Sequence, residues 1–325
     1  MTHLLEVKDL EVKFALRFGE LTAIDGVSFS LGKGERLGLV GESGAGKSVT
    51  GFAIINLISK PGYISGGQIF FDGNVLNTLP DSAMRKIRGN RISMIFQDPM
   101  MTLNPVLTIG TQMVETLQAH RRISTAEAEA IALDKLRKVT IPSPEKRLKQ
   151  YPHEFSGGMR QRIVVAIALL TEPALIIADE PTTALDVTIQ AEIMELLLDL
   201  CETENMGLIL ITHDLGVVSE VTEKIAVMYA GKIVESGQTT EIIESPQHPY
   251  TRGLIKALPG SLKPGEPLHQ IPGMMPTLME MPPGCAFHPR CTLKVAQCET
   301  SIPRLLKAGA GDHLAACFVT AGRDN

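Results

Sequence analysis

The sequence lacks several features that would mark a membrane, secreted or nucleic-acid-binding protein. No stretch approaches the roughly 18–20 uninterrupted apolar residues that a membrane-spanning helix needs. The first residues, MTHLLEVKDLEVKF, show no basic segment followed by an apolar run, so no signal peptide is predicted. The net charge of -5 gives no basic excess of the kind that accompanies nucleic-acid binding. We therefore expect a cytosolic protein without a nucleic-acid partner.

Cysteine is scarce over most of the chain and concentrated at its end. The first 284 residues contain one, Cys201, and the last 41 contain four: Cys285, Cys291, Cys298 and Cys317. Thiols in the cytosol stay reduced, which makes disulfides a poor explanation for this group. Cys201 lies in the helical stretch AEIMELLLDLCETEN and is expected to be a core residue.

The spacing of the four late cysteines is C-x5-C-x6-C-x18-C. Short zinc sites usually contain C-x2–4-C pairs, and this segment has no such pair. Four thiolates in longer loops suit a 4Fe-4S cluster, in which each iron needs one cysteine. Zinc, with His288 or His313 replacing a thiolate, is one alternative, and four free thiols are another. We expect a structural role, because nothing nearby indicates a redox substrate.

The strongest local signal is RLGLVGESGAGKSVTGFAIINLI, which reads as a strand, a loop and a helix. Residues 41–48 fit G-x-x-x-x-G-K-[ST] in that setting. Glycine lets the backbone curl so that N–H groups converge on phosphate oxygens at a helix N-terminus. Lys47 is expected to reach the β- and γ-phosphates, and Ser48 to bind Mg²⁺. The ATP-binding residues predicted here are Gly41, Ser43, Gly44, Gly46, Lys47, Ser48 and Val49.

A second nucleotide motif lies in PALIIADEPTTALD. ALIIA has the length and composition of a central parallel strand, and it ends at Asp179 and Glu180. Open α/β sheets bind ligands at the carboxyl ends of their strands. Asp179 is expected to hold Mg²⁺ through water, and Glu180 to polarise the attacking water as a general base. Together the two motifs predict a P-loop ATPase.

The stretch HEFSGGMRQRIVVAIALL indicates which kind of P-loop ATPase this is. Ser156, Gly157 and Gly158 precede a basic, then apolar, helix and resemble the signature motif of ATP-binding cassette (ABC) ATPases. A hydroxyl and two glycine amides at a helix N-terminus form a second anion site. The resemblance implies that this site closes on the γ-phosphate of a nucleotide bound to the opposite subunit. Met159 stands where the family usually has glutamine, and phosphate binding should survive this change.

Four further positions match the ABC family one at a time. The resemblance implies that Gln97 in MIFQDP approaches the Mg²⁺ and the attacking water. It implies that Asp186 in TTALDV crosses a dimer interface and that His213 in LILITHDL contacts the γ-phosphate. An aromatic side chain near the N-terminus should stack on adenine; Phe14 is the predicted residue and Phe18 the alternative.

These landmarks predict an α/β fold: an ABC-type nucleotide-binding domain with an inserted helical subdomain and a small, irregular, Cys-rich extension. The RecA-like core is expected in residues 1–97 and 160–240. Residues 98–159 lack a strand pattern and include TAEAEAIALDKLRKV, with apolar positions at helical spacing. They resemble the helical signature subdomain that receives a coupling helix of a membrane partner. The extension is expected in residues 241–325.

The segment ESPQHPYTRGLIKALPG, residues 244–260, narrows the family further. It resembles the segment that follows the core in ATPase subunits of bacterial dipeptide and oligopeptide importers. Similar subunits of dipeptide permeases carry a 4Fe-4S cluster in this region, so the resemblance favours the cluster over zinc.

One phosphate loop and one signature motif make half of a working ATPase in this family. The resemblance implies a second, similar but distinct ATPase subunit, two membrane permease subunits and an extracytoplasmic solute-binding protein. It implies a peripheral location on the cytoplasmic face of the membrane. The implied function is ATP hydrolysis that powers import of di- or oligopeptides or related small solutes, with nickel chelates as an alternative cargo.

Two other functions fit parts of the sequence. A soluble ABC ATPase acting on DNA or ribosomes usually carries a long coiled coil or two cassettes in one chain, and this sequence shows neither. An iron–sulfur redox protein with an incidental nucleotide domain would need its cysteines for turnover, and it would depend little on ATP hydrolysis.

Overall fold

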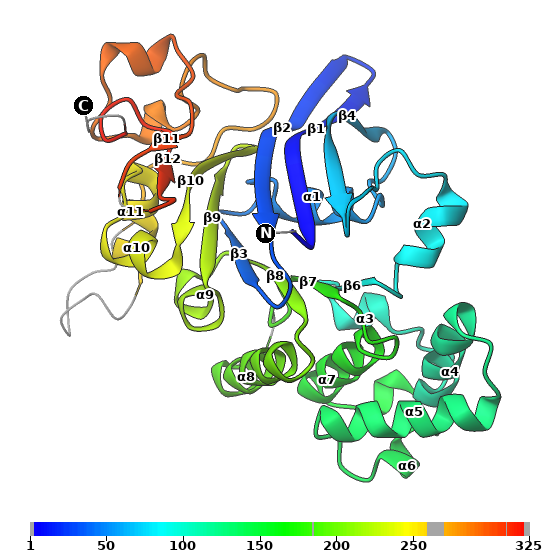
Figure 1. Cartoon of the computed structure of the whole chain (residues 1–325). Coiled ribbons are helices and arrows are strands. Elements are labelled where there is room, and N and C mark those ends of the chain that lie inside the picture. Colours follow the sequence, from blue (N-terminus) through cyan, green and yellow to red (C-terminus); the bar gives the residue numbers. More distant parts are fainter. Residues whose placement is uncertain (1–2, 184, 259–269, 310, 322–325) are drawn as a thin grey trace. The chain divides into compact units, whose positions relative to one another are not determined.

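The computed structural model describes residues 3–183, 185–258, 270–309 and 311–321. The chain separates into two compact units, which are described one at a time (Figure 1). The first combines Met1–Thr78 with Leu210–Asn325, and the second is Leu79–Ile209. Strand β8 (Gly207–Thr212) runs from the second unit into the first. The boundaries predicted at residues 97, 159 and 240 stay predictions.

The first unit contains a four-stranded antiparallel sheet. In sheet order its strands are β2 (Gly19–Leu31), β1 (Leu5–Leu16), β4 (Gly62–Phe71) and β5 (Asn74–Val75). Strand β1 is central and pairs with both β2 and β4, so Leu5 lies opposite Leu31 on one side and Phe71 on the other. These three side chains are buried, which fixes the register through the apolar face of the sheet.

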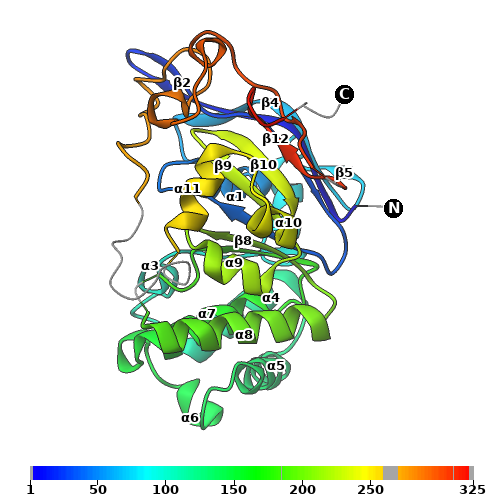
Figure 2. The ribbon, with the colours of Figure 1, turned by 90° about the vertical axis from the view of Figure 1, so that its left-hand side faces the viewer.

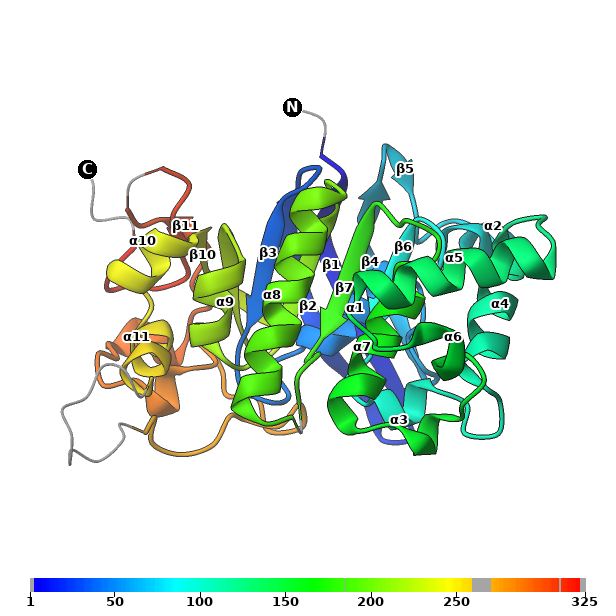
Figure 3. The same cartoon turned by 90° about the horizontal axis from the view of Figure 1, so that it is seen from below.

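A second sheet carries the phosphate-loop segment. Its strands in the first unit are, in order, β11 (Leu306–Lys307), β12 (Leu314–Ala315), β10 (Lys232–Gln238), β9 (Lys224–Tyr229), β3 (Arg36–Val40) and β8. Strands β3 and β9 pair in parallel. Strand β8 is buried throughout, and β3 and β9 are buried beyond their first residues, as expected of inner strands covered on both faces. Helix α9 (Leu215–Val221) packs against β3 (Figure 3). Helix α1 (Lys47–Ile54) is the next element after β3 in the chain.

The C-terminal part of the first unit is irregular, as its Pro and Gly content predicts. Its helices are short: α10 (Thr239–Glu244), α11 (Pro249–Lys256), η3 (His288–Arg290) and η4 (Ala296–Glu299). Strand β12 extends the sheet by pairing with the edge of β10 (Figure 2).

The buried carboxylate of Glu235 ties these C-terminal pieces to β10. This side chain is fully buried, and it accepts hydrogen bonds from the N–H groups of Gln247 (2.6 Å) and His248 (2.9 Å). Its Oε1 also lies 2.7 Å from Nε2 of His313, next to β12. A buried carboxylate is stable only when its oxygens are satisfied, so all three contacts hold the extension in place.

The second unit combines a parallel strand pair with a group of helices. Strands β6 (Ile92–Ile95) and β7 (Leu175–Asp179) pair in parallel, and β8 continues their sheet. The helices are α2 (Asp81–Ile87), α3 (Pro99–Thr102), α4 (Ile109–His120), α5 (Thr125–Lys138), α6 (Pro144–Arg147), η1 (Pro152–Glu154), α7 (Gly157–Ala168) and α8 (Val187–Thr203). Residues 98–159, all of them described, contain helices and turns and no strand.

Helix α5 shows why the predicted helical stretch forms. Ser124 and Glu127 make a capping box, in which each side chain accepts from the backbone N–H of the other. Ala128, Ala132 and Leu136 recur at helical spacing and are fully buried. This face packs on α4 and α7 (Figure 1).

Two expectations from composition can be compared with these helices. Cys201 is 1% exposed in α8, which confirms it as a core residue. Among the residues that the structure describes, no helix has both the length and the apolar character needed to cross a membrane.

Candidate nucleotide-binding site

The predicted phosphate loop connects β3 to α1 in the first unit. Gly46 is the N-cap of α1 with φ of 105°, a conformation that suits glycine. A Cβ atom at Gly41 would lie 2.3 Å from the backbone oxygen of Met228, so a side chain at that position has no room. Both glycines are therefore required by the path of the chain, and the loop ends at the positive pole of a helix.

Lys47 lies at the centre of this loop. Its side chain is buried, and Nζ donates to the carbonyl oxygens of Gly41 (2.8 Å) and Glu42 (3.0 Å). The carbonyl of Ala45 accepts from the N–H of Gly231 in the β9–β10 turn (2.9 Å). The loop is thus closed around an ammonium group and fixed to the neighbouring hairpin, which is a geometry suited to binding phosphate.

Two predicted catalytic residues meet in the second unit. Strands β6 and β7 align Ile95 with Ala178, so Gln97 and Glu180 each lie two residues beyond a matched pair. Nε2 of Gln97 donates to Oε2 of Glu180 at 3.1 Å, and Oγ1 of Thr183 donates to the same oxygen at 2.9 Å. The two donors orient the carboxylate, as the role of a general base requires.

The backbone at Glu180 adds a feature that the sequence did not reveal. Its φ is 45°, in the left-handed region that glutamate seldom occupies. Asp179, the last residue of β7, is 3% exposed, whereas Glu180 is half-buried. The turn therefore directs two adjacent carboxylates into different environments. Thr183 was missed by sequence reasoning, although a hydroxyl three residues after the acidic pair could have indicated it.

The signature turn opens helix α7 in the second unit. Ser156 is the N-cap, and its Oγ accepts from the N–H of Met159 at 3.4 Å. Ser156 and Gly157 are exposed. A Cβ atom at Gly158 would lie 2.8 Å from Cγ2 of Ile189, so a larger residue would push α7 away from α8. The predicted anion-binding amides thus stand at an exposed helix N-terminus.

Asp186 and His213 have local surroundings that can be described, while their family roles stay predictions. The Asp186 carboxylate caps α8 by accepting from the N–H of Ile189 at 3.0 Å. His213 follows β8 in the first unit and is exposed. The next residue, Asp214, caps α9 by accepting from the N–H of Gly216 at 2.8 Å.

The structure separates the two candidates for adenine stacking. Phe14 lies in β1 opposite Gly62 of β4 and is half-buried, with its ring covering that glycine. Phe18 lies in the turn between β1 and β2 and is 66% exposed. Phe18, the alternative, therefore has the more accessible ring. Which of the two side chains stacks on adenine stays a prediction.

The four late cysteines line one small cavity in the first unit. All four are free thiols, and Phe287 also lines the cavity. Burial raises the pKa of Cys285 to about 11, with further contributions from the other three thiols. Burial likewise raises the pKa of Cys291. Buried thiols that lie around one cavity resist ionisation unless a cation compensates their charge.

The histidines considered as zinc ligands lie in different places. His288 is on the cavity wall, with Nδ1 2.9 Å from the carbonyl oxygen of Cys285. His313 is bonded to Glu235 and is not among the described residues that line the cavity. Within the described ranges, no group of three or more His, Cys, Asp or Glu side chains is arranged to hold a metal ion. The cavity thus gathers the four thiols without holding them in a metal-binding arrangement.

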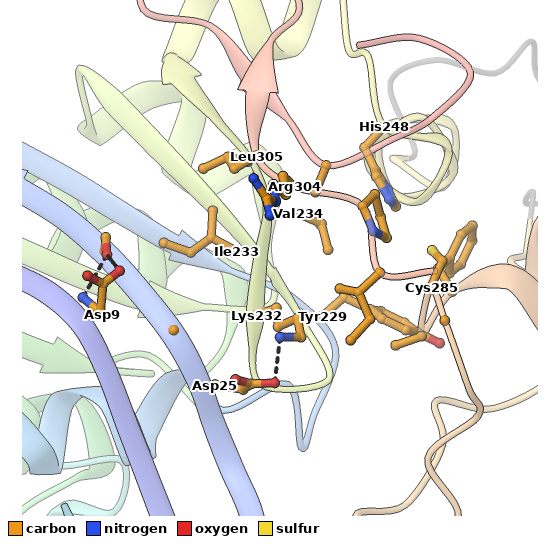
Figure 4. A pocket seen from close by; sticks show the side chains of 18 residues that line it. Asp9, Asp25, Tyr229, Lys232, Ile233, Val234, His248, Cys285, Arg304 and Leu305 are labelled. Carbon is orange, nitrogen blue, oxygen red and sulfur yellow. Dashed lines mark hydrogen bonds and ion pairs between the residues drawn. The ribbon is translucent and has the colours of Figure 1, made fainter. Parts of the chain in front are cut away.

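A larger cavity of about 380 Å³ lies next to the cysteine cavity (Figure 4). It is walled by β1, β2, β10 and the C-terminal segment, and Cys285 contributes to both cavities. Two of its charged groups are already paired, because Lys232 binds Asp25. None of the described residues 41–48 lines it, so it is separate from the phosphate loop.

Comparison with known proteins places these motifs in a family. Residues 24–183 match the model of the ABC transporter family, and residues 234–298 match that of the oligopeptide/dipeptide transporter C-terminal region. The chain is 48% identical over 315 residues to the oligopeptide transport ATP-binding protein OppD of Salmonella typhimurium, covering 97% of this chain and 93% of that protein. It is 54% identical over 289 residues to OppD of Bacillus subtilis, covering 88% and 81%.

Solved structures agree with this placement. The ATP-binding cassette MJ0796, solved as a dimer in a post-hydrolysis state with ADP and phosphate, has a TM-score of 0.65 and 28% identity. The match covers 72% of this chain and 98% of that chain. The expected α/β cassette fold is thereby confirmed. This chain belongs to the ATP-hydrolysing subunits of ABC transporters, in the family that carries the oligopeptide/dipeptide transporter C-terminal region.

Proposed function

We propose that this chain hydrolyses ATP to power the import of oligopeptides or dipeptides through separate membrane subunits. The observation that carries the proposal is the combination of a closed phosphate loop around Lys47 with an oligopeptide-transporter C-terminal region. The relatives named as oligopeptide transport ATP-binding proteins span nearly the whole chain, which supports peptides over nickel chelates as the cargo.

In this proposal the residues of each unit have separate roles. The phosphate loop binds the β- and γ-phosphates through its N–H groups and Lys47. Ser48 of the first unit, and Gln97 and Asp179 of the second, carry oxygen atoms of the kind that Mg²⁺ prefers, and a bound metal would offset the negative charge of the phosphates. Glu180, oriented by Gln97 and Thr183, takes a proton from the attacking water.

The chain is proposed to act as one half of a pair. It has one phosphate loop and one signature turn, and Ser156 stands at an exposed helix N-terminus. The dimeric state of the related cassette MJ0796 supports pairing. We infer a similar but distinct second ATPase subunit, two membrane permease subunits and an extracytoplasmic solute-binding protein. The chain would lie peripherally on the cytoplasmic face of the membrane.

Replacement of the general base tests the ATPase proposal. Glu180→Gln removes the proton acceptor and keeps the shape, so ATP hydrolysis should fall by about 10²–10⁴-fold while nucleotide binding persists. Phosphate release and binding of a fluorescent ATP analogue measure the two effects. Glu195→Gln, an exposed glutamate of α8, is the matched control. Undiminished hydrolysis by Glu180→Gln would refute the assignment.

The cargo is tested with the assembled transporter in lipid vesicles. With the membrane subunits and the solute-binding protein present, oligopeptides should stimulate ATP hydrolysis by this chain and accumulate inside the vesicles. If a nickel chelate stimulated ATP hydrolysis and peptides of two to five residues did not, peptides would be excluded as the cargo. The proposal that the chain powers an importer would still hold.

We further propose that the four late cysteines hold a 4Fe-4S cluster with a structural role. The number of donors supports it, because four free thiols line one small cavity and a 4Fe-4S cluster needs four, although the described side chains are not arranged to hold a metal ion. Such a cluster would supply the cation charge that buried thiolates need, and Cys285, Cys291, Cys298 and Cys317 would bind it.

Metal analysis of anaerobically purified protein tests the cluster. We expect about four irons and four acid-labile sulfides per chain. Cys285→Ser should lose them, whereas Cys201→Ala, a buried cysteine of α8, should keep them. Stoichiometric zinc without sulfide would establish the zinc alternative and reject the cluster.

A further inference from the structure

The C-terminal extension reaches the phosphate loop at three points. The hydroxyl of Tyr250 accepts from the N–H of Glu42, the second residue of the loop, at 2.8 Å. Nη1 of Arg290 donates to both carboxylate oxygens of Glu42, at 3.1 and 3.0 Å. The methyl group of Met275 lies 3.0 Å from the position that a Cβ of Gly44 would take. The loop is thus held from outside by residues far from it in the sequence.

Arg290 is fixed in place before it meets the loop. Its side chain is 6% exposed, and Nε donates to the carbonyl oxygen of Pro272 at 2.9 Å. The guanidinium lies 5.8 Å from the ring centre of Tyr229 and 5.9 Å from that of Phe287. A buried guanidinium needs a counter-charge, which Glu42 supplies. The ion pair therefore restrains the loop on one side and the extension on the other.

The same arginine is part of the cysteine segment. Arg290 ends the short helix η3 and directly precedes Cys291. Its N–H donates to the carbonyl of Phe287 at 3.0 Å, and the N–H of Cys291 donates to the carbonyl of His288 at 3.2 Å. A change in the arrangement of the thiols therefore displaces the backbone that carries this guanidinium.

We propose that Arg290 and Tyr250 are positioning residues for the phosphate loop and couple nucleotide binding to the state of the cysteine segment. Tyr250 fixes the first N–H after Gly41, and Arg290 fixes the side chain of the same residue, Glu42. Both hold the loop in the curled form in which its remaining N–H groups can converge on phosphate. The inference rests on the proposed role of this loop in nucleotide binding.

Coupling between two sites is reciprocal, which gives the proposal a second observable. If the cysteine segment favours the nucleotide-binding form of the loop, nucleotide must in turn stabilise the cysteine segment. Bound nucleotide should then slow amide hydrogen exchange in residues 285–298, whose N–H groups at Cys285 and Cys291 bind backbone carbonyls of the same segment.

Nucleotide affinity of Arg290 and Tyr250 variants is the first test. The dissociation constant of a fluorescent ATP analogue should rise about 10-fold in Arg290→Ala and about threefold in Tyr250→Phe. Arg290→Lys should fall between, because an ammonium keeps the charge and loses the planar fork. Hydrolysis should show a raised KM with kcat nearly unchanged at saturation. Arg304→Ala, an exposed arginine of the same segment, is the matched control and should bind as the wild type does.

A double-mutant cycle separates positioning from general damage to the fold. Glu42→Gln and Arg290→Ala should each raise the dissociation constant of the ATP analogue. The double variant should bind little worse than whichever single variant binds more weakly. Tyr250→Phe keeps the buried ring and only loses the hydroxyl, so it remains informative if Arg290→Ala fails to fold.

Hydrogen exchange of residues 285–298 is the second test, with a non-hydrolysable ATP analogue and Mg²⁺ as the probe. Exchange in this segment should slow severalfold with nucleotide in the wild type and not in Arg290→Ala. Wild-type affinity in folded Arg290→Ala and Tyr250→Phe would overturn the inference, and so would hydrogen exchange in residues 285–298 that nucleotide leaves unchanged. If Lys47→Ala also binds normally, the loop is not the nucleotide site and the proposed function fails; if only Lys47→Ala loses binding, the coupling alone fails.

Discussion

The phosphate loop and the signature turn are both glycine-rich entries into helices, yet they are held very differently. The loop closes around the buried Lys47 and is restrained by Tyr250, Arg290 and the β9–β10 turn. The signature turn is exposed, and its one recorded side-chain cap, Ser156 to the N–H of Met159, is long at 3.4 Å.

The difference bears on which of the two proposed anion sites has its donors arranged within this chain. A preorganised loop binds its ligand without further ordering, since the cost of arranging its donors is met during folding. An exposed turn with a weak cap gains its full set of contacts only when something covers it. The first pattern suits a site for the chain's own nucleotide, and the second suits a nucleotide presented by another subunit.

Replacement of Lys47 should have the largest effect on this comparison. Lys47→Ala removes the ammonium from the loop, so nucleotide affinity should fall roughly 100-fold, the size expected for lost charge-assisted hydrogen bonds. Fluorescence titration with an ATP analogue measures it. Lys33→Ala, an exposed lysine just before β3, is the control. If Lys47→Ala and Lys33→Ala bound the ATP analogue equally well, the phosphate loop would not be a preformed nucleotide site. The contrast with the signature turn would then fail.

Acid should lower the stability of the fold through His248, which binds Tyr250, one of the residues that restrain the phosphate loop. Burial lowers the pKa of His248 to about 4, with Glu235 opposing and Arg252 adding to the shift. The unfolded chain therefore binds the extra proton first, and up to about 3 kcal/mol of stability is lost as the pH falls from about 6.5 to 4. Urea unfolding across this range measures the loss.

The matched variant for the acid effect is His248→Asn. Asparagine keeps an acceptor for the N–H of Tyr250, which Nδ1 of His248 binds at 3.1 Å, and it does not titrate. Its unfolding free energy should decline less over the same pH range. Parallel declines in the two proteins would show that other groups cause the effect.

Replacement of Ser156 should give the smallest effect and the most selective one. Ser156→Ala removes one hydrogen bond to charge at the predicted second anion site, so kcat should fall about 10-fold while the affinity of the separate chain for nucleotide stays unchanged. Ser124→Ala, the N-cap of α5, is the control, since it loses a cap of similar kind away from the turn. A loss of affinity in Ser156→Ala would contradict the division between the two sites.

Much of the site follows from the sequence because its residues stand at strand ends. Gln97 and Glu180 each follow an apolar run, so parallel pairing of the two runs is enough to bring them together. Signals of this kind are local and survive without knowledge of the whole fold. The gathering of the four thiols was likewise indicated by their number in one short segment.

Other features depend on contacts that no local pattern encodes. Arg290 and Glu42 are 248 positions apart, and only the folded extension brings them together. The positive φ of Glu180 has no signal either, since glutamate is an unfavourable choice for that conformation. The sequence position favours Phe14 as the residue that stacks on adenine, but Phe18, in the β1–β2 turn, has the more exposed ring.

The contact between Glu235 and His313 has a consequence for the order in which the chain can fold during synthesis. The second unit is a continuous segment and is complete when Ile209 has left the ribosome. The first unit is discontinuous, and the buried carboxylate of Glu235 on β10 lacks this partner until His313, 78 positions later, has been synthesised. The unit that holds the phosphate loop is therefore completed after the second unit.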